Sequence, residues 1–362
     1  MRLLRSRGGR IPHPLRDTMT WIGSISPTTN AGPGTRKVSG NSWTNGSTGS
    51  RTVKRIWGSC RGRDSRPSDL THAMRTPCHT APSAVISRRP EMPSPDKRTP
   101  TPVERMIVAA SHLVEDHAVL MVGTQWPIIV SLLARATHAP GAVICYEGGI
   151  VLQDMPGRIP LFTADPVVQS CAAFLGESLD TLGMVLHGGR CRMALLSAAS
   201  VDRFGNINTT CIGPYVSPTL RFGGSGGACD FGSLSPRTVI VMEHDRRRFP
   251  ERVDFITTPG YLDGGGERYR AGLRPRTGPY AVVTTLGLFR FNEAGEMILS
   301  GFHEGTDVEE IRGQVQWDLK VADDVGPLPS PTPLELDTLR RLDPERMYLE
   351  YKRLLEGKEI SL

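Results

Sequence analysis

From about residue 101 onward, short apolar strands alternate with amphipathic helices, and this alternation limits the fold more than any other feature of the chain. Apolar residues recur at helical spacing in 103–115, and a short apolar strand follows at 118–123. A second helix at 126–137 leads into a second strand at 142–146. Strands separated by helices of roughly 10–15 residues are typical of α/β domains. We therefore predict an α/β fold with an open, largely parallel sheet flanked by helices.

The same pattern continues through most of the remaining chain. Further helices are expected at 166–175, 308–316 and 333–341. Further strands are expected at 184–187, 193–198, 238–243, 255–258, 281–285 and 288–291. A proline-rich run, PLPSPTP at 327–333, reads as a linker. We therefore expect the α/β domain at 101–326, followed by the linker and a C-terminal helical tail at 327–362.

The first 100 residues differ from the rest in charge and composition. They hold 18 Lys and Arg against 5 Asp and Glu, whereas the rest of the chain holds 25 against 32. They are rich in Arg, Ser, Thr, Pro and Gly without a sustained apolar period, so we expect a disordered basic leader at 1–100. The first interpretation is a segment without function or upstream of the true start, since Met92 and Met106 lie near the first helix. A transit peptide, a partner-docking tail and a basic arm are the alternatives.

Composition argues against several classes of protein. No apolar run approaches the roughly 18 residues of a membrane-spanning helix, so we expect no membrane partner. The seven cysteines include no CxxC pair, which argues against a zinc ribbon, and their odd number fits the reducing cytosol. The nine histidines form no HExxH or HxH pattern, so no metal site is expected. Aromatic residues do not interleave with the basic ones, so no nucleic-acid partner is expected. We therefore predict a cytoplasmic protein.

A glutamate follows the strand at 142–146 directly. Glu147 precedes two glycines, Gly148 and Gly149, which would let a substrate approach the backbone closely. Open α/β sheets bind ligands at the carboxyl ends of their strands, and a carboxylate placed there can act as a base or a nucleophile. The alternative is a structural glutamate that caps a helix or pairs with an arginine, and spacing alone favours that alternative.

Two loops are further candidates for binding. Four glycines occur among the five residues 223–227, and their N–H groups could converge on a phosphate or an oxyanion. This loop fits neither a P-loop nor a dinucleotide fingerprint, and a flexible turn is the alternative. The run EHDRRR at 243–248 offers guanidinium groups to a phosphate-bearing ligand, or it is a solvated charged loop. The polar segment 202–208 is read as a tight turn.

Six segments taken together resemble the β subunit of family I CoA-transferases, of the glutaconate CoA-transferase type. The resemblance runs from about residue 101 to about 345 and leaves out the leader. The segments follow the family's order at similar spacing, and they are 122–124, 146–149, 201–210, 221–228, 242–249 and 257–264.

The resemblance implies a mechanism. Glu147 falls on the family's catalytic glutamate, which attacks an acyl-CoA and carries CoA as a glutamyl thioester in ping-pong catalysis. The coenzyme A thioester is a substrate, and no permanently bound cofactor is implied. Gly148 departs from the family's pattern, which commonly has Ser after the glutamate. The other site residues implied are oxyanion or acyl-CoA-binding groups: Gly224, Ser225, Gly226, Gly227, Asn206 and Asn208.

The resemblance also implies a partner and leaves rival functions open. The family needs an α subunit, and no second half is present in this chain, so we expect a hetero-oligomer that takes acyl-CoA and carboxylate substrates. Relatives in the superfamily hydrolyse a C–C bond in ring-derived acyl-CoA during steroid degradation, but their β subunit lacks the glutamate. Glu147 therefore favours transfer over hydrolysis. A non-catalytic binding module, with the basic leader as its working part, is the third interpretation.

Overall fold

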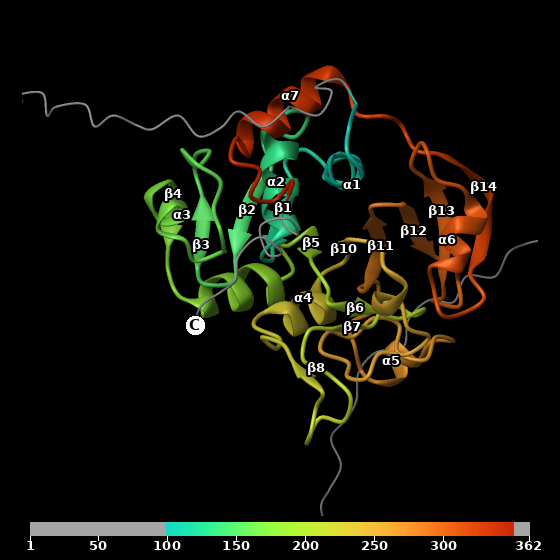
Figure 1. Ribbon diagram of the computed structural model, residues 1–362. Helices are drawn as coiled ribbons and strands as arrows, with labels where there is room; N and C mark the ends of the chain where they lie inside the picture. Colours follow the sequence, from blue (N-terminus) through green and yellow to red (C-terminus); the bar gives the residue numbers. More distant parts are fainter. Residues whose placement is uncertain (1–98, 351–362) are drawn as a thin grey trace, which may run out of the picture. The chain divides into compact units, whose positions relative to one another are not determined.

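The computed structural model describes residues 99–350, in which ten strands form one mixed sheet (Figure 1). The strand order is β14-β13-β12-β11-β10-β5-β1-β2-β3-β4. Neighbouring strands run parallel from β11 to β2. Antiparallel pairs continue the sheet to β4 on one side and to β13 on the other, where β14 adds a parallel pair at the edge. The predicted open sheet is confirmed, and its parallel part is the centre. The strands are β1 (Val119–Val122), β2 (Val143–Tyr146), β3 (Ile150–Leu152), β4 (Ala172–Leu175), β5 (Met193–Leu196), β10 (Thr238–Met242), β11 (Pro279–Thr284), β12 (Gly287–Phe291), β13 (Met297–Phe302) and β14 (Lys320–Pro327).

Helices and two short hairpins complete the described part of the chain. The hairpins pair β6 (Ser200–Val201) with β7 (Ile207–Asn208), and β8 (Cys211–Ile212) with β9 (Leu220–Arg221). The helices are α1 (Pro102–Ser111), α2 (Trp126–Ala136), α3 (Pro166–Ser170), α4 (Ala228–Leu234), α5 (Glu267–Arg270), α6 (Val308–Gly313), α7 (Pro333–Leu342), the π-helix η1 (Leu179–His187) and the 3-10 helix η2 (Arg246–Arg248).

Side chains of the central strands alternate between two cores, because successive residues of a strand point to opposite faces of the sheet. Leu120 and Val122 of β1 join the core formed with α1, α2 and α7. Met121, between them, joins the opposite core, which includes residues of η1, α4 and α6. All five residues of β10 are buried, as expected for a parallel strand covered on both faces. Because both faces are covered, ligands can reach this part of the sheet at the ends of its strands and not at its faces.

The C-terminal helix α7 packs against α1 and α2 (Figure 1). Arg340 of α7 donates two hydrogen bonds to the fully buried carboxylate of Glu104 in α1, at 2.8 and 3.1 Å. The residues after α7 continue the contact, since the Tyr348 hydroxyl donates to the carbonyl oxygen of Pro160. The predicted tail helix therefore belongs to the same packed body as the sheet.

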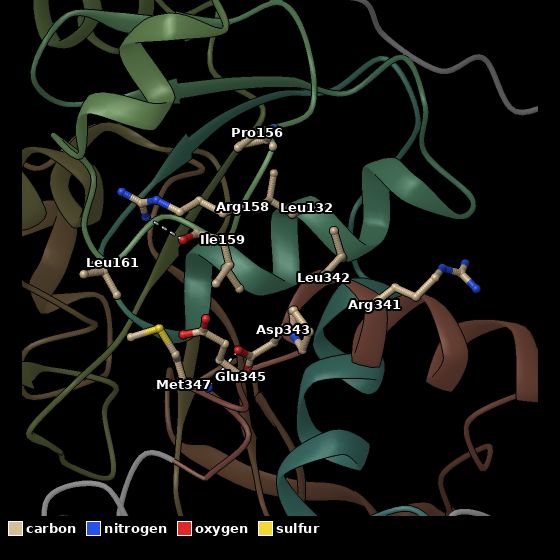
Figure 2. A pocket seen from close by; sticks show the side chains of 12 residues that line it. Leu132, Pro156, Arg158, Ile159, Leu161, Arg341, Leu342, Asp343, Glu345 and Met347 are labelled. Carbon is tan, nitrogen blue, oxygen red and sulfur yellow. Dashed lines mark hydrogen bonds between the residues drawn. The ribbon is translucent and has the colours of Figure 1, made fainter. Parts of the chain in front are cut away.

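A cavity of about 440 Å³ lies between α2, the segment 156–161 and the residues that follow α7 (Figure 2). Leu132, Ile159 and Met347 are among the apolar side chains that line it. Two of the charged groups that line it are engaged within the chain. Arg158 pairs with Asp165, and Asp343 accepts backbone N–H groups of the residues that follow it. We therefore place no chemistry in this cavity.

Three predicted elements are wrong. The helix expected at 166–175 ends at Ser170, and 172–175 form the edge strand β4. The strand expected at 184–187 is the last part of the π-helix η1. The segment 255–258 is not a strand, although Thr258 makes an isolated bridge to Ile207. Each run is four to ten residues long and apolar, and periodicity cannot assign so short a run to a helix or a strand.

Several predictions fall outside the described residues. The leader predicted at 1–100 lies outside them apart from residues 99 and 100, and so does the end of the predicted tail at 351–362. None of the helices within 99–350 combines the length and apolar character that a bilayer-spanning helix needs.

Candidate active site

A cavity of about 510 Å³ opens at the carboxyl ends of four adjacent parallel strands. Residues 123–126 after β1, Glu147 after β2, residues 196–199 at the end of β5 and Glu243 after β10 all line it. The glycine loop at 223–225 forms another wall. This is the edge of an open α/β sheet where ligands bind, so the structure brings together the glutamate and the glycine loop that the sequence singled out.

Glu147 is held by backbone atoms of the glycine loop. The N–H of Gly227 donates to Oε2 of Glu147 at 2.5 Å. A Cβ atom at Gly227 would lie 2.5 Å from that same oxygen, and one at Gly226 would lie 3.0 Å from Oε1. Gly226 also has a φ of 50°, which disfavours other residues. Glycine at these positions therefore lets the loop approach the carboxylate.

The backbone around Glu147 is fixed from the other side by η1. The hydroxyl of Thr181 in η1 donates to the carbonyl oxygen of Glu147 at 3.1 Å. Gly149 has a φ of 91°, and a Cβ atom there would lie 2.4 Å from the backbone of Gly176, just after β4. A Cβ atom at Gly148 would meet nothing within 4 Å. Gly149 is thus required by close packing, whereas Gly148 has room for a side chain.

The glycine loop is tied to the segment that follows β7. The N–H of Gly224 donates to the carbonyl oxygen of Thr209 at 2.9 Å, and the Thr209 hydroxyl donates back to the Gly224 oxygen at 2.8 Å. The Ser225 hydroxyl accepts the N–H of Cys229 at 3.0 Å as the chain enters α4. Within residues 99–350 the N–H groups of Ser225 and Gly226 have no hydrogen-bond partner. The Gly223 N–H likewise has no partner among these residues, so these three groups are the donors of this loop that remain for an anion.

The structure does not bring Asn206 and Asn208 to the cavity. The side-chain nitrogen of Asn206 donates to the Asp202 carboxylate and to the Leu262 oxygen, and its Oδ1 accepts two backbone N–H groups. Asn208 donates to the Cys211 oxygen at 2.7 Å. Both side chains are buried and do not line the cavity. These amides hold the β6–β7 hairpin and the loops around it. Asn side chains commonly make such hydrogen bonds to nearby backbone groups in turns.

Three residues at or beside the cavity were not singled out individually from the sequence. Thr181 supports Glu147 from a segment that the sequence did not predict to be helical. Gln125 lines the cavity with a φ of 65°, which no sequence pattern indicates. Arg248 also lines the cavity, and it belongs to the EHDRRR run that the sequence offered as an anion site.

The thiol nearest to Glu147 along the chain is buried and is not expected to act as a nucleophile. Cys145 lies two residues before Glu147 and is almost fully buried in the core on the side of η1 and α4. Burial raises the pKa of its thiol to about 12, so the thiol stays protonated near neutral pH. Among residues 99–350 no group of three or more His, Cys, Asp or Glu side chains could hold a metal ion. Glu147 therefore remains the candidate nucleophile.

Comparisons with known proteins bear on this geometry. A family model described as Coenzyme A transferase matches residues 103–314. Over 242 residues the chain is 36% identical to the B subunit of 3-oxoadipate CoA-transferase from Pseudomonas knackmussii, covering 66% of this chain and 92% of the relative. Over 253 residues it is 31% identical to the B subunit of glutaconate CoA-transferase from Acidaminococcus fermentans, covering 68% and 94%.

A solved structure and a more distant relative extend the comparison. The crystal structure of glutaconate coenzyme A-transferase from Acidaminococcus fermentans superposes with a TM-score of 0.65 at 30% identity, covering 69% of this chain and 97% of that chain. A cholesterol ring-cleaving hydrolase IpdB subunit of Rhodococcus jostii is 27% identical over 241 residues, covering 65% of this chain and 86% of the relative.

Proposed function

Because this chain belongs to the coenzyme A transferase family, we propose that it is the β subunit of a heteromeric enzyme that moves CoA from an acyl-CoA to a carboxylic acid, with Glu147 as nucleophile. One observation carries the proposal. The Glu147 carboxylate stands at the strand-end cavity, and its orientation is fixed by the Gly227 N–H. A nucleophile that is already oriented toward its substrate needs less ordering in the transition state.

Each half of the reaction needs two carbonyl substitutions and no net proton transfer. A Glu147 oxygen attacks the acyl-CoA carbonyl, the C–S bond breaks, and CoA leaves as a thiolate while an acyl-glutamyl anhydride remains. The thiolate then attacks the glutamyl carbonyl and releases the acyl carboxylate, which leaves CoA on Glu147 as a thioester. An incoming carboxylate reverses these steps and leaves as the new acyl-CoA.

Each step passes through a tetrahedral oxyanion that the protein has to stabilise. We assign this role to the unpartnered N–H groups of Ser225 and Gly226, next to the bond that orients Glu147. Loss of one such donor costs roughly a hundred- to a thousandfold in kcat in comparable sites. Gly224 and Gly227 shape the loop, and their own N–H groups are engaged. Asn206 and Asn208 have no oxyanion role in this proposal, because their amides are used within the chain.

Dicarboxylic acids are the proposed substrate class. Two relatives are named for dicarboxylic acids, 3-oxoadipate and glutaconate. The cavity is lined by both carboxylate and guanidinium groups, so it is built for polar substrates as well as for an acyl chain. Coenzyme A enters as part of the substrate and leaves as part of the product.

We propose a separate α subunit as the partner, and the apolar surface beside Glu147 as its docking site. The names of the relatives describe them as B subunits, each one member of a larger enzyme. The docking surface consists of Phe174, Leu175, Leu179 and Met184, on the edge strand β4 and on η1; Leu179 is 74% exposed and Met184 62%. It is continuous with the site, because η1 contacts the Glu147 backbone through Thr181. Apolar side chains on an exposed sheet edge are usually covered by a partner.

The test traps the covalent enzyme. The chain is co-purified with its α subunit, exposed to a panel of acyl-CoA thioesters and treated with borohydride, and its tryptic peptides are weighed. Cleavage after Arg135 and Arg158 gives peptide 136–158, in which Glu147 is the sole glutamate. We expect a mass change on this peptide with the donor substrate, and none in Glu147→Gln. A mass change on another residue would overturn the assignment of the nucleophile.

The second candidate function is hydrolysis of a ring-derived acyl-CoA, which the match to the IpdB subunit favours. A hydrolase uses water as its nucleophile and forms no enzyme–CoA thioester. A labelled free carboxylic acid therefore separates the two functions: the transferase incorporates the labelled acid into the acyl-CoA pool, whereas the hydrolase does not. Consumption of substrate without exchange and without an adduct would establish hydrolysis in place of transfer.

A further inference from the structure

Arg248 is the sole cation among the described residues that line the Glu147 cavity. The cavity's other charged side chains are two carboxylates, Glu147 after β2 and Glu243 after β10. An arginine in such a place can neutralise an anionic group of a bound ligand, and its planar fork suits a carboxylate in particular.

The backbone that carries Arg248 is firmly held. Its N–H donates to the Asp245 carbonyl oxygen at 2.8 Å, which closes the short helix η2. The next residue, Phe249, is fully buried and stacks on His244 with ring centroids 4.3 Å apart. The Phe249 carbonyl oxygen accepts the N–H of Gln316 at 2.9 Å. The Arg248 side chain is therefore attached to a well-held backbone segment at the cavity wall.

The Arg248 side chain is half-buried, and among residues 99–350 its charge acts on the Asp245 carboxylate without a hydrogen bond or ion pair to it. Its neighbour differs in this respect. Arg247 pairs with the Asp245 carboxylate at 2.8 Å, so the nearest acidic side chain of η2 is already taken. Arg246, the third arginine of the run, is exposed and does not line the cavity. The three arginines are thus divided into one toward the cavity and two toward solvent.

The sheet sets the separation between Arg248 and the nucleophile. β1 and β5 lie between β2, which carries Glu147, and β10, which leads to Arg248. Neighbouring strands are roughly 4.8 Å apart, so the ends of β2 and β10 stand roughly 14 Å apart. Glu147 follows β2 directly, Arg248 lies on η2 beyond β10, and both residues line the same cavity. A short substrate whose reacting carboxyl lies at Glu147 has its far end near Arg248.

We propose that Arg248 binds the distal carboxylate of a dicarboxylic substrate and thereby selects dicarboxylic over monocarboxylic acids. This inference rests on the proposed function, because it assumes that the reacting carboxyl lies at Glu147. It adds a specificity residue that the catalytic steps themselves do not require. The CoA phosphates are the other anions that could meet an arginine here, and the test separates the two sources.

The test compares acceptors that differ at one end only. The complex with the α subunit is assayed with glutarate and with pentanoate, which share five carbons and one reacting carboxyl. In Arg248→Gln we expect kcat/KM for glutarate to fall by about ten- to a hundredfold, the usual effect of losing a charged hydrogen bond, and that for pentanoate to change less than about twofold. The matched control Arg246→Gln should change neither value.

Two results would overturn the proposal. An equal loss with glutarate and pentanoate would assign Arg248 to the CoA moiety or to folding, and no loss would remove it from the site. Calorimetric titration of free glutarate, a ligand without phosphate, into the complex gives a readout that needs no turnover. If the complex bound glutarate through Arg248 but transferred CoA to no acid, the proposed function would fail while the carboxylate site remained.

Discussion

Gly227 and Glu147 are in contact at a distance that leaves no room for a side chain. The Gly227 N–H lies 2.5 Å from Oε2, and a Cβ atom would lie as close to that oxygen and 3.1 Å from the Glu147 Cβ. We expect Gly227→Ala to displace the carboxylate and lower kcat by about a hundredfold, as misplacement by 1 Å does elsewhere. The measurement is kcat together with the yield of the Glu147 adduct.

Gly313→Ala provides the control for that substitution, since Gly313 ends α6 and a Cβ atom there would meet nothing within 4 Å. It should leave both kcat and the adduct yield unchanged. If Gly227→Ala kept the wild-type kcat, the loop would have moved to accept the methyl group without loss of activity. The loop would then not orient the carboxylate.

At the scale of residues, the sequence singled out the glutamate and the glycine loop as candidates but not their contact. A charged residue at a strand end and a dense glycine run draw attention to Glu147 and to 223–227, yet spacing alone favours a structural role, and the family resemblance makes them site candidates. The resemblance also implies Asn206 and Asn208, and the structure shows their amides bonded within the chain. Whether an amide faces a ligand or a neighbouring loop depends on tertiary packing, which no local pattern records.

At the scale of elements, the buried pair Glu104–Arg340 connects α1 to α7. Burial alone would raise the pKa of Glu104, but hydrogen bonds from Arg340 and from the Thr101 N–H outweigh it and lower that pKa below 4.5. Arg340→Met would leave a buried, unpaired carboxylate. We expect it to lower the free energy of unfolding by about 3 kcal/mol at pH 7, measured by urea unfolding.

A second variant isolates the charge. Glu104→Gln combined with Arg340→Met should recover more than half of the loss, because no buried charge is left without a partner. Since the folded-state pKa of Glu104 is depressed, its contribution is complete above pH 4.5 and is lost as the pH falls through the folded-state value. Arg312→Met, at an exposed pair with Glu309, should have no measurable effect; a loss as large as that of Arg340→Met would contradict the argument.

The elements that sequence predicted well include the strands buried on both sides. β1, β2, β5 and β10 are continuous apolar runs between helices, and each was predicted within two residues. β4 and η1 were missed for the opposite reason. Phe174 and Leu175 are apolar yet exposed, so their apolar character does not indicate which residues of this segment are buried. Apolar residues on an exposed edge strand do not follow the alternation of a half-buried strand, so a single sequence does not assign them.

At the scale of the molecule, assembly should depend on the exposed apolar residues beside the site. We expect Leu179→Asp combined with Met184→Asp to prevent co-purification with the α subunit, because the charges would be buried unpaired at the contact. The thermal stability of the isolated chain should stay the same, since both side chains are exposed. Sedimentation of the mixed subunits measures the complex directly.

The control for the docking surface is Leu334→Asp, a comparable exposed leucine on α7, on the face of the sheet opposite η1. It should leave the complex intact. If Leu334→Asp dissociated the subunits and the double variant did not, the partner would bind the face covered by α1, α2 and α7 instead.

The support of Glu147 comes from main-chain atoms and from one hydroxyl that bonds to its backbone. None of these contacts depends on what the side chain at position 147 is, apart from its having an acceptor within reach of Gly227. In evolutionary terms the proposed nucleophile can therefore be exchanged while the backbone that surrounds it stays unchanged. A lineage can replace it in a single mutation, keep the fold and the ligand cavity, and begin to explore a different reaction on the same class of substrate.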